Sequence, residues 1–179
     1  LEQTGEGSVL IFTRTKHRAK RLAVCLHEEG RAVTCLQGKL SQNRRKAALE
    51  GFREGKFNIL VATDIASRGI DISEITHVIN FDIPDTTDAY THRIGRTGRA
   101  AKTGDAFTLV TQQDEPIVRD IERALGARID RRKVEGFDYS AKQSAAPGFS
   151  ARGARHPPRA SRHHAHKAPH APRYPRRGR

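Results

Sequence analysis

Methionine and tryptophan are absent from this sequence of 179 residues, and cysteine occurs only at Cys25 and Cys35. Two cysteines supply neither a disulfide framework nor the ligand set of a zinc site, and such sparing use is typical of a reducing compartment. No apolar run approaches the ~18–20 residues that a membrane span needs, and no signal peptide opens the chain. We therefore expect a cytoplasmic protein without a membrane partner. Because the chain begins at Leu1 rather than at methionine, we also expect a piece of a longer protein.

Acidic residues are missing from the end of the chain. Residues 141–179 contain ten Lys or Arg, five His and six Pro, but no Asp, Glu, Leu, Ile or Val. Such a segment has little apolar surface with which to offset its ordering entropy, so it is expected to be a disordered basic tail. Residues 1–140 have 23 Lys or Arg against 20 Asp or Glu, and they are numerous enough to form one domain with its own core.

Short apolar runs alternate with helical periods along residues 1–140. The runs predict strands at 9–12, 32–36, 59–61, 77–81 and 106–110, with a candidate sixth strand at 129–134. Between them, helices are expected after Thr15, after Ser41 and around Pro116, with Gly30, Gly55 and Gly126 near their ends. Strands that alternate with amphipathic helices predict an α/β fold, in which a mostly parallel sheet of five to six strands has helices on both faces.

Ligands of such folds bind at the loops beyond the carboxyl ends of the strands. Two polar segments that follow predicted strands are therefore the candidate binding loops. One spans residues 63–71, and the other holds His92, Arg96 and Arg99 at a spacing that would line them on one helical face. Guanidinium groups suit phosphate oxygens. A solvated basic helix face is the alternative, but glycines at 95 and 98 would weaken a helix and indicate close approach of a backbone or a ligand.

Five segments in order resemble motifs of the C-terminal RecA-like domain of DEAD-box RNA helicases. They are VLIFTRTK (9–16), QNRR (42–45), VATDIASRGID (61–71), INFDIP (79–84) and YTHRIGRTGRA (90–100). The resemblance covers about residues 8–130, and the HRIGRTGR octet is its most specific part, because its leading histidine distinguishes this family from related helicases. It implies a RecA-like three-layer sandwich. Basic tails follow this domain in many bacterial members, which is a weaker likeness.

The resemblance implies roles for residues that face ATP. Arg96 and Arg99 match arginine fingers that contact the γ-phosphate and neutralise charge during transfer to water. Asp71 matches the acid that holds the ribose, and Gly69 lies where the backbone nears the nucleotide. His92 and Arg93 match residues that couple the ATP state to the interface between domains.

Other matching residues imply an RNA track. Thr63 and Arg45 match contacts to the sugar-phosphate backbone, and Arg14 and Gly38 belong to the same edge. Two positions depart from the family pattern: Gln37 stands where histidine is usual, and Ser67 replaces a common alanine. Neither change removes a phosphate-binding group.

Two motifs of an ATPase of this class are missing. No G-x-x-x-x-G-K-[ST] loop and no Asp-Glu-Ala-Asp string occurs in the chain. The ATP phosphates and Mg²⁺ are therefore expected on an N-terminal RecA-like domain of the same parent protein, and this chain alone is expected to be inactive. The implied function is that of the C-terminal half of an ATP-dependent RNA helicase acting on single strands and short duplexes. The alternative is a non-enzymatic RNA-binding or chaperone module that acts through its tail.

The cysteines and histidines carry weaker signals. Cys25 and Cys35 are expected as small core residues rather than reactive thiols. His17, His27 and His77 are isolated, and the tail histidines lack the partners of a closed metal site, so no metal site is predicted in this chain. The tail arginines and Tyr174 favour a nucleic-acid arm, with a solubilising tail as the alternative.

Overall fold

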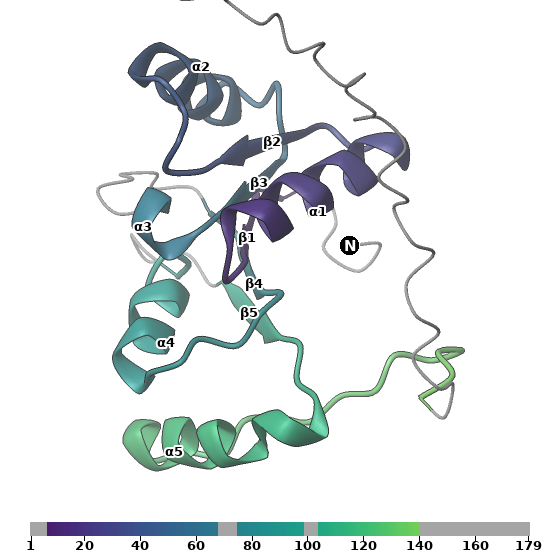
Figure 1. Ribbon diagram of the computed structural model, residues 1–179. Helices are drawn as coiled ribbons and strands as arrows, with labels where there is room; N and C mark the ends of the chain where they lie inside the picture. Colours follow the sequence, from purple (N-terminus) through teal and green to yellow (C-terminus); the bar gives the residue numbers. More distant parts are fainter. Residues whose placement is uncertain (1–6, 68–74, 99–103, 140–179) are drawn as a thin grey trace, which may run out of the picture. The chain divides into compact units, whose positions relative to one another are not determined.

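A computed structural model describes residues 7–67, 75–98 and 104–139 of the chain (Figure 1). The chain divides into two units, Leu1–Arg131 and Arg132–Arg179. The first unit holds all the helices and strands that the structure describes. The expected boundary at residue 140 stays a prediction.

Five parallel strands form the sheet, in the order β2-β3-β1-β4-β5. They are β1 (Val9–Phe12), β2 (Val33–Leu36), β3 (Ile59–Ala62), β4 (His77–Asn80) and β5 (Asp105–Thr108). β1 lies at the centre, with Val9 in register with Ile59 of β3 and with His77 of β4. Both of its faces are covered, which explains why its sequence is an unbroken apolar run rather than an alternating one.

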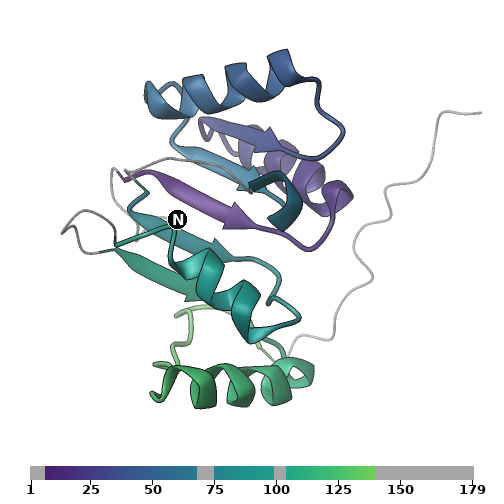
Figure 2. The same ribbon diagram turned by 90° about the vertical axis from the view of Figure 1, so that its left-hand side faces the viewer.

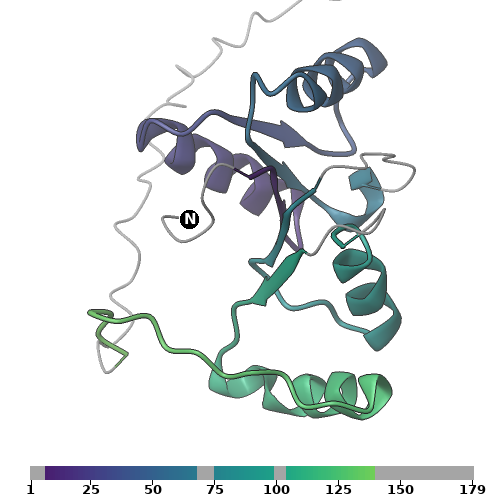
Figure 3. The ribbon, with the colours of Figure 1, turned by 180° about the vertical axis from the view of Figure 1, so that it is seen from behind.

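Helices cover both faces of the sheet, as the sequence predicts. The helix α1 (Lys16–Glu28) packs through Ala19 onto Val9, Ile11 and Val61 on one face. On the other face, α2 (Gln42–Arg53) and α3 (Asp64–Ser67) pack onto the alternate side chains of the same strands, Leu10, Phe12, Leu60 and Ala62. Figures 1 and 3 show α1 and α3 on opposite sides of the sheet. The α/β three-layer arrangement is therefore confirmed.

Two further helices build a smaller core near β4 and β5. Tyr90 of α4 (Thr87–Ile94) packs with Ile83 and with Val118 and Ile121 of α5 (Glu115–Leu125). Figure 2 shows α5 beyond the β5 edge of the sheet, next to α4. A short 3₁₀ helix, η2 (Gln112–Asp114), leads into α5.

The helix ends follow the local chemistry of the sequence. The hydroxyls of Thr15 and Ser41 accept hydrogen bonds from Arg18 N and Arg44 N, so both residues cap their helices as predicted. At the end of α5, Gly126 adopts a left-handed conformation with φ 66°, which a residue with a Cβ adopts only at a cost.

The candidate sixth strand at 129–134 is wrong, because this segment is not a strand in the structure. Ile129 instead packs beside α5, and its backbone N–H donates to Glu122 Oε1 at 3.0 Å. Arg131 adds ion pairs to Glu115 and Glu122. Ile129 and Arg131 are thus held by side chains of α5 and not by a sheet edge. The fifth strand also ends earlier than predicted, since Leu109 and Val110 lie past β5 and are exposed.

The two cysteines differ from each other. Cys25 is exposed, so its placement in the core is wrong: it lies on the outer side of the stripe formed by Leu22 and Leu26. Cys35 is half-buried against the α1 face, and this burial raises the pKa of its thiol, opposed in part by the nearby charge of Lys20.

Among the described residues, no helix has the length and apolarity needed to cross a bilayer.

Candidate functional site

The site is built where the strands end. Because all paired strands run parallel, their carboxyl ends meet along one edge of the sheet. Thr13 follows β1, Thr63 follows β3, and Asp82 lies just after β4. All three are buried polar residues, which need partners at this edge.

Arg93 of α4 reaches this edge from a nearly inaccessible position, with 3% of the residue exposed, and bonds to Asp82 and to the neighbouring Asp64 and Asn80. Its Nε and Nη2 donate to the two carboxylate oxygens of Asp64, each at 2.7 Å, which forms a bidentate pair. Its Nη1 donates to the carbonyl of Asp82 at 2.7 Å and to Asn80 Oδ1 at 3.1 Å. The guanidinium also lies 5.1 Å from the centre of the Phe12 ring. The charge of this buried arginine is thus compensated on several sides.

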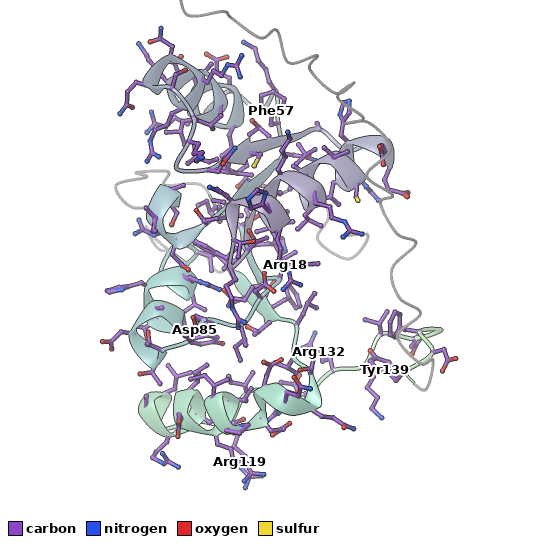
Figure 4. All side chains as sticks on the ribbon, in the orientation of Figure 1. Arg18, Phe57, Asp85, Arg119, Arg132 and Tyr139 are labelled. Carbon is purple, nitrogen blue, oxygen red and sulfur yellow. The ribbon has the colours of Figure 1, made fainter. Side chains whose placement is uncertain are left out.

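A second ion-pair group surrounds Asp82, whose side chain is 7% exposed. Its carboxylate accepts from the backbone N–H of Arg14 at 2.8 Å and pairs with Arg18 Nη1 at 2.5 Å. The Arg14 guanidinium lies 3.3 Å from Asp85 and donates to the carbonyl of Ile83. Figure 4 labels Arg18 at the start of α1 and Asp85 before α4. Arg14 is exposed on this edge, and it is already oriented by its neighbours.

The segment after α4 differs from the sequence prediction. The helix ends at Ile94 with Gly95 as its cap, so Arg96 lies half-buried in a turn and not on a helical face shared with His92. The Thr97 hydroxyl lies 2.9 Å from the carbonyls of both Ile75 and Thr76, which precede β4. The expectation that this segment lies at the carboxyl edge is therefore wrong for Thr97, which is anchored at the amino edge.

Helix length explains this path. Eight residues of α4 rise roughly 12 Å, about the length of a four-residue strand, so α4 carries the chain back across the sheet. Arg93 still reaches the carboxyl edge, because helix side chains tilt toward the helix N-terminus.

The glycines of this turn serve close packing. Gly98 has a φ of 69°. A Cβ on Gly104 would lie 2.7 Å from Gly98 N and 1.8 Å from the Thr97 hydroxyl. The close approach that the sequence indicated is therefore made by a second backbone segment, at Gly104.

The remaining predicted site residues are spread over two regions. Thr63 is buried beside Asp64, while Gly38 is exposed in the turn before α2 and Arg45 is half-buried in the first turns of that helix. His92 is exposed on α4. Three predicted ligand-facing residues lie outside the described residues: Gly69, Asp71 and Arg99.

Sequence reasoning assigned no roles to the partners of Arg93. Asp64, Asn80 and Asp82 lie inside two of the quoted motifs, directly at strand ends, which is the signal that marks them. In the described part of the chain, no group of three or more His, Cys, Asp or Glu side chains is placed to hold a metal ion.

The three-layer parallel sheet is that of a RecA-like domain, as its match to a solved DEAD-box protein shows. The chain belongs to the helicase conserved C-terminal domain family, whose model matches residues 1–101. It is 46% identical over 129 residues to the DEAD-box ATP-dependent RNA helicase CshA of Bacillus subtilis, covering 72% of this chain and 26% of that protein. The chain thus spans about a quarter of that relative's length.

Solved structures agree with this membership. A crystal structure of the E. coli DEAD-box protein SrmB bound to regulator of ribonuclease activity A matches with a TM-score of 0.69 and 40% identity, covering 73% of this chain and 77% of that one. The S. cerevisiae Dbp5 bound to RNA and ADP BeF3 matches with a TM-score of 0.66 and 34% identity, covering 72% of this chain and 36% of that one.

Proposed function

We propose that this chain is the C-terminal half of an ATP-dependent RNA helicase that unwinds short duplexes locally in the cytoplasm. Its partner is an N-terminal RecA-like domain of the same protein, and its substrates are ATP and RNA. Support comes from the family membership and from a relative whose name states ATP-dependent RNA helicase activity. The Dbp5 neighbour, solved with RNA and ADP BeF3, supports RNA and an adenine nucleotide as ligands.

The bidentate pair of Arg93 with Asp64 is the observation that carries the mechanism. Asp64 follows Thr63, the proposed RNA contact, and Arg93 lies three residues before Arg96, the proposed arginine finger. A displacement at Thr63 would thus be passed to the finger segment through a partly buried, charge-assisted contact. We assign the coupling role of Arg93 to this internal contact, with His92 on the exposed side of the same helix.

The arginine fingers have an electrostatic task. Arg96 and Arg99 would neutralise the charge that spreads over the equatorial oxygens of the transferred phosphoryl group. Asp71 and Gly69 would hold the ribose side of the nucleotide. Arg14, Gly38, Arg45 and Thr63 would follow the RNA backbone along the carboxyl edge and the start of α2.

Mg²⁺ is assigned to the N-terminal domain. The carboxylates of Asp64 and Asp82 are already paired with Arg93 and Arg18, so they do not suit a cation that prefers free oxygen ligands. No step of the mechanism proposed for this chain passes through the metal.

A test separates the helicase half from an RNA-binding module that acts through its tail. The isolated chain is assayed for ATP hydrolysis alone and after addition of the N-terminal domain of its parent protein, with and without RNA. Turnover only in the combined, RNA-containing sample supports the proposal. RNA binding without any RNA-stimulated hydrolysis in the combined sample would favour the binding module.

A further inference from the structure

Residues 134–139, here called the aromatic turn, expose three large apolar side chains within six positions. Val134, Phe137 and Tyr139 are 63%, 63% and 58% exposed. The turn belongs to the second unit, and Figure 4 labels Tyr139 within it. Apolar groups gathered in this way on a surface mark an interaction site more often than isolated ones do.

The turn holds its rings in a defined arrangement. Gly136 has a φ of 75°, and the backbone N–H of Phe137 donates to the carbonyl of Val134 at 3.4 Å. The Tyr139 hydroxyl accepts from the backbone N–H of Val134 at 2.8 Å. The Phe137 and Tyr139 rings meet edge to face, with centroids 4.8 Å apart and planes at 68°. A pair that is held in this way and remains more than half exposed loses little conformational entropy on binding.

The charge around the turn selects the occupant. Arg132 and Lys133 directly precede it and are balanced by Glu135 and Asp138 within it, whereas residues 141–179 follow it with ten Lys or Arg and no acid. Aromatic rings beside a positively charged stretch are the combination that binds single-stranded nucleic acid, in which bases stack on the rings and phosphates pair with the cations. An apolar protein partner would not require that the turn be followed by a segment with ten cations and no acid.

We propose that the aromatic turn is a base-stacking site for single-stranded RNA, in which unpaired bases stack on Phe137 and Tyr139. This inference deepens the proposed function and rests on its RNA substrate. The site would hold a strand after it is released from a duplex, because bases in a duplex are stacked on each other and cannot reach the rings. It adds base contacts that do not depend on salt to a tail that is expected to contact phosphates.

The experiment compares binding of the full chain to a single-stranded oligouridine and to a duplex of equal length, by fluorescence anisotropy over a salt series. The test variants are Phe137→Leu and Tyr139→Leu, which keep apolar bulk and remove the ring. Tyr139→Phe is the matched control, since it keeps the ring that stacks and removes only the hydroxyl with its hydrogen bond from Val134 N–H. We expect each leucine variant to weaken single-strand binding about 5-fold or more, with unchanged salt slope and unchanged duplex affinity, and Tyr139→Phe to retain most of the affinity.

The outcomes separate this inference from the function on which it rests. Wild-type affinity for the single strand in both leucine variants overturns the stacking site and leaves the RNA substrate intact. An equal loss on single strand and duplex overturns it as well, because stacking on unpaired bases cannot weaken duplex binding. Absence of RNA binding by the unaltered chain contradicts the proposed function itself. Ultraviolet crosslinking of uridine to a peptide that contains Phe137 or Tyr139 gives an independent positive result.

Discussion

Arg93 is the residue on which the described part of the site depends. It lies on a helix that crosses the sheet, and its guanidinium binds an acid after β3, an amide in β4 and a carbonyl after β4. Lysine offers one charged nitrogen and cannot reproduce this planar, bidentate contact. A single side chain thereby fixes α4 relative to two strand ends.

Replacing Arg93 with alanine is expected to destabilise the chain by about 2–3 kcal/mol. The destabilisation arises because Asn80 Oδ1 and the Asp82 carbonyl are left without this donor. It is smaller than for a fully buried ion pair, because the Asp64 side chain is 43% exposed and regains water. Urea denaturation measures the change. Arg123→Ala is the matched control: its pair with Asp120 is exposed, so a change within about 0.5 kcal/mol is expected. Equal effects of the two substitutions would refute the role given to Arg93.

The partners of Arg93 illustrate what the sequence leaves open. Helix caps such as Thr15 and Ser41 are predictable, because the cap bond joins residues three positions apart. Asp64 and Arg93 are 29 positions apart, and their pairing depends on how the sheet, α3 and α4 come together. Residue type and strand-end position therefore indicate the candidates, but only the tertiary arrangement determines the pairs.

The turn after α4 shows the role of backbone packing between elements. Gly104, directly before β5, lies against the turn that follows α4. Thr97 of that turn is hydrogen-bonded to the carbonyls of Ile75 and Thr76, directly before β4. The elements that carry Arg96 are thus held at the amino edge of the sheet by a contact too close for a side chain.

Gly104→Ala is expected to destabilise the chain by about 1–3 kcal/mol, because its Cβ would overlap the backbone nitrogen of Gly98 as well as a side chain. Thermal unfolding measures the effect. Gly38→Ala serves as the control, since a Cβ there meets nothing within 4 Å and the change is expected to stay within about 0.5 kcal/mol. A Gly104→Ala variant as stable as Gly38→Ala would contradict this packing.

The start of α5 makes stability depend on pH. The Thr111 hydroxyl and then its backbone N–H donate to Asp114 and lower the pKa of that carboxyl below its ordinary value. A lowered folded-state pKa adds stability above about pH 4, and this is lost as pH falls through the folded value. The loss of stability caused by Asp114→Ala should therefore be larger at pH 7 than at pH 3 by chemical denaturation. A gap that is equal at both pH values would show that the carboxylate contributes nothing.

At the level of elements, the sequence predicted the five strands, the three major helices and the layered α/β fold, because buried runs and helical periods are local signals. Two errors have one cause. Ile129 opens a stretch of strand-like composition but bonds to Glu122 of α5, and the helix that carries His92 ends at Ile94, before Arg96. In both cases a neighbouring element, absent from the local pattern, determined the backbone path.

For the whole molecule, charge is divided between a balanced segment and a basic one. Residues 141–179 contribute ten of the net thirteen positive charges, while the sheet and its covering helices all precede residue 132. We therefore expect fold and RNA affinity to be separable.

Deletion of residues 141–179 is expected to weaken RNA binding and to flatten its salt dependence. The slope of log affinity against log salt concentration should become less steep by roughly 0.7 for each phosphate that is no longer neutralised. The thermal unfolding of the remaining chain should not change. Arg45→Ala, which removes one proposed phosphate contact, should weaken binding only modestly and leave the slope nearly unchanged. An anisotropy titration over a salt series measures all three proteins, and an unchanged slope after the deletion would favour a solubilising tail.

We propose that this chain supplies the arginine fingers of an RNA-stimulated ATPase, and turnover of the full-length parent protein tests this role most directly. Steady-state ATP hydrolysis at saturating RNA is measured for Arg96→Ala, for Arg99→Ala and for the surface control Arg123→Ala. We predict that each finger substitution lowers the turnover number by about 10³-fold or more, with RNA affinity nearly unchanged and the control at wild-type turnover. Near-normal turnover in Arg96→Ala and Arg99→Ala would contradict the account.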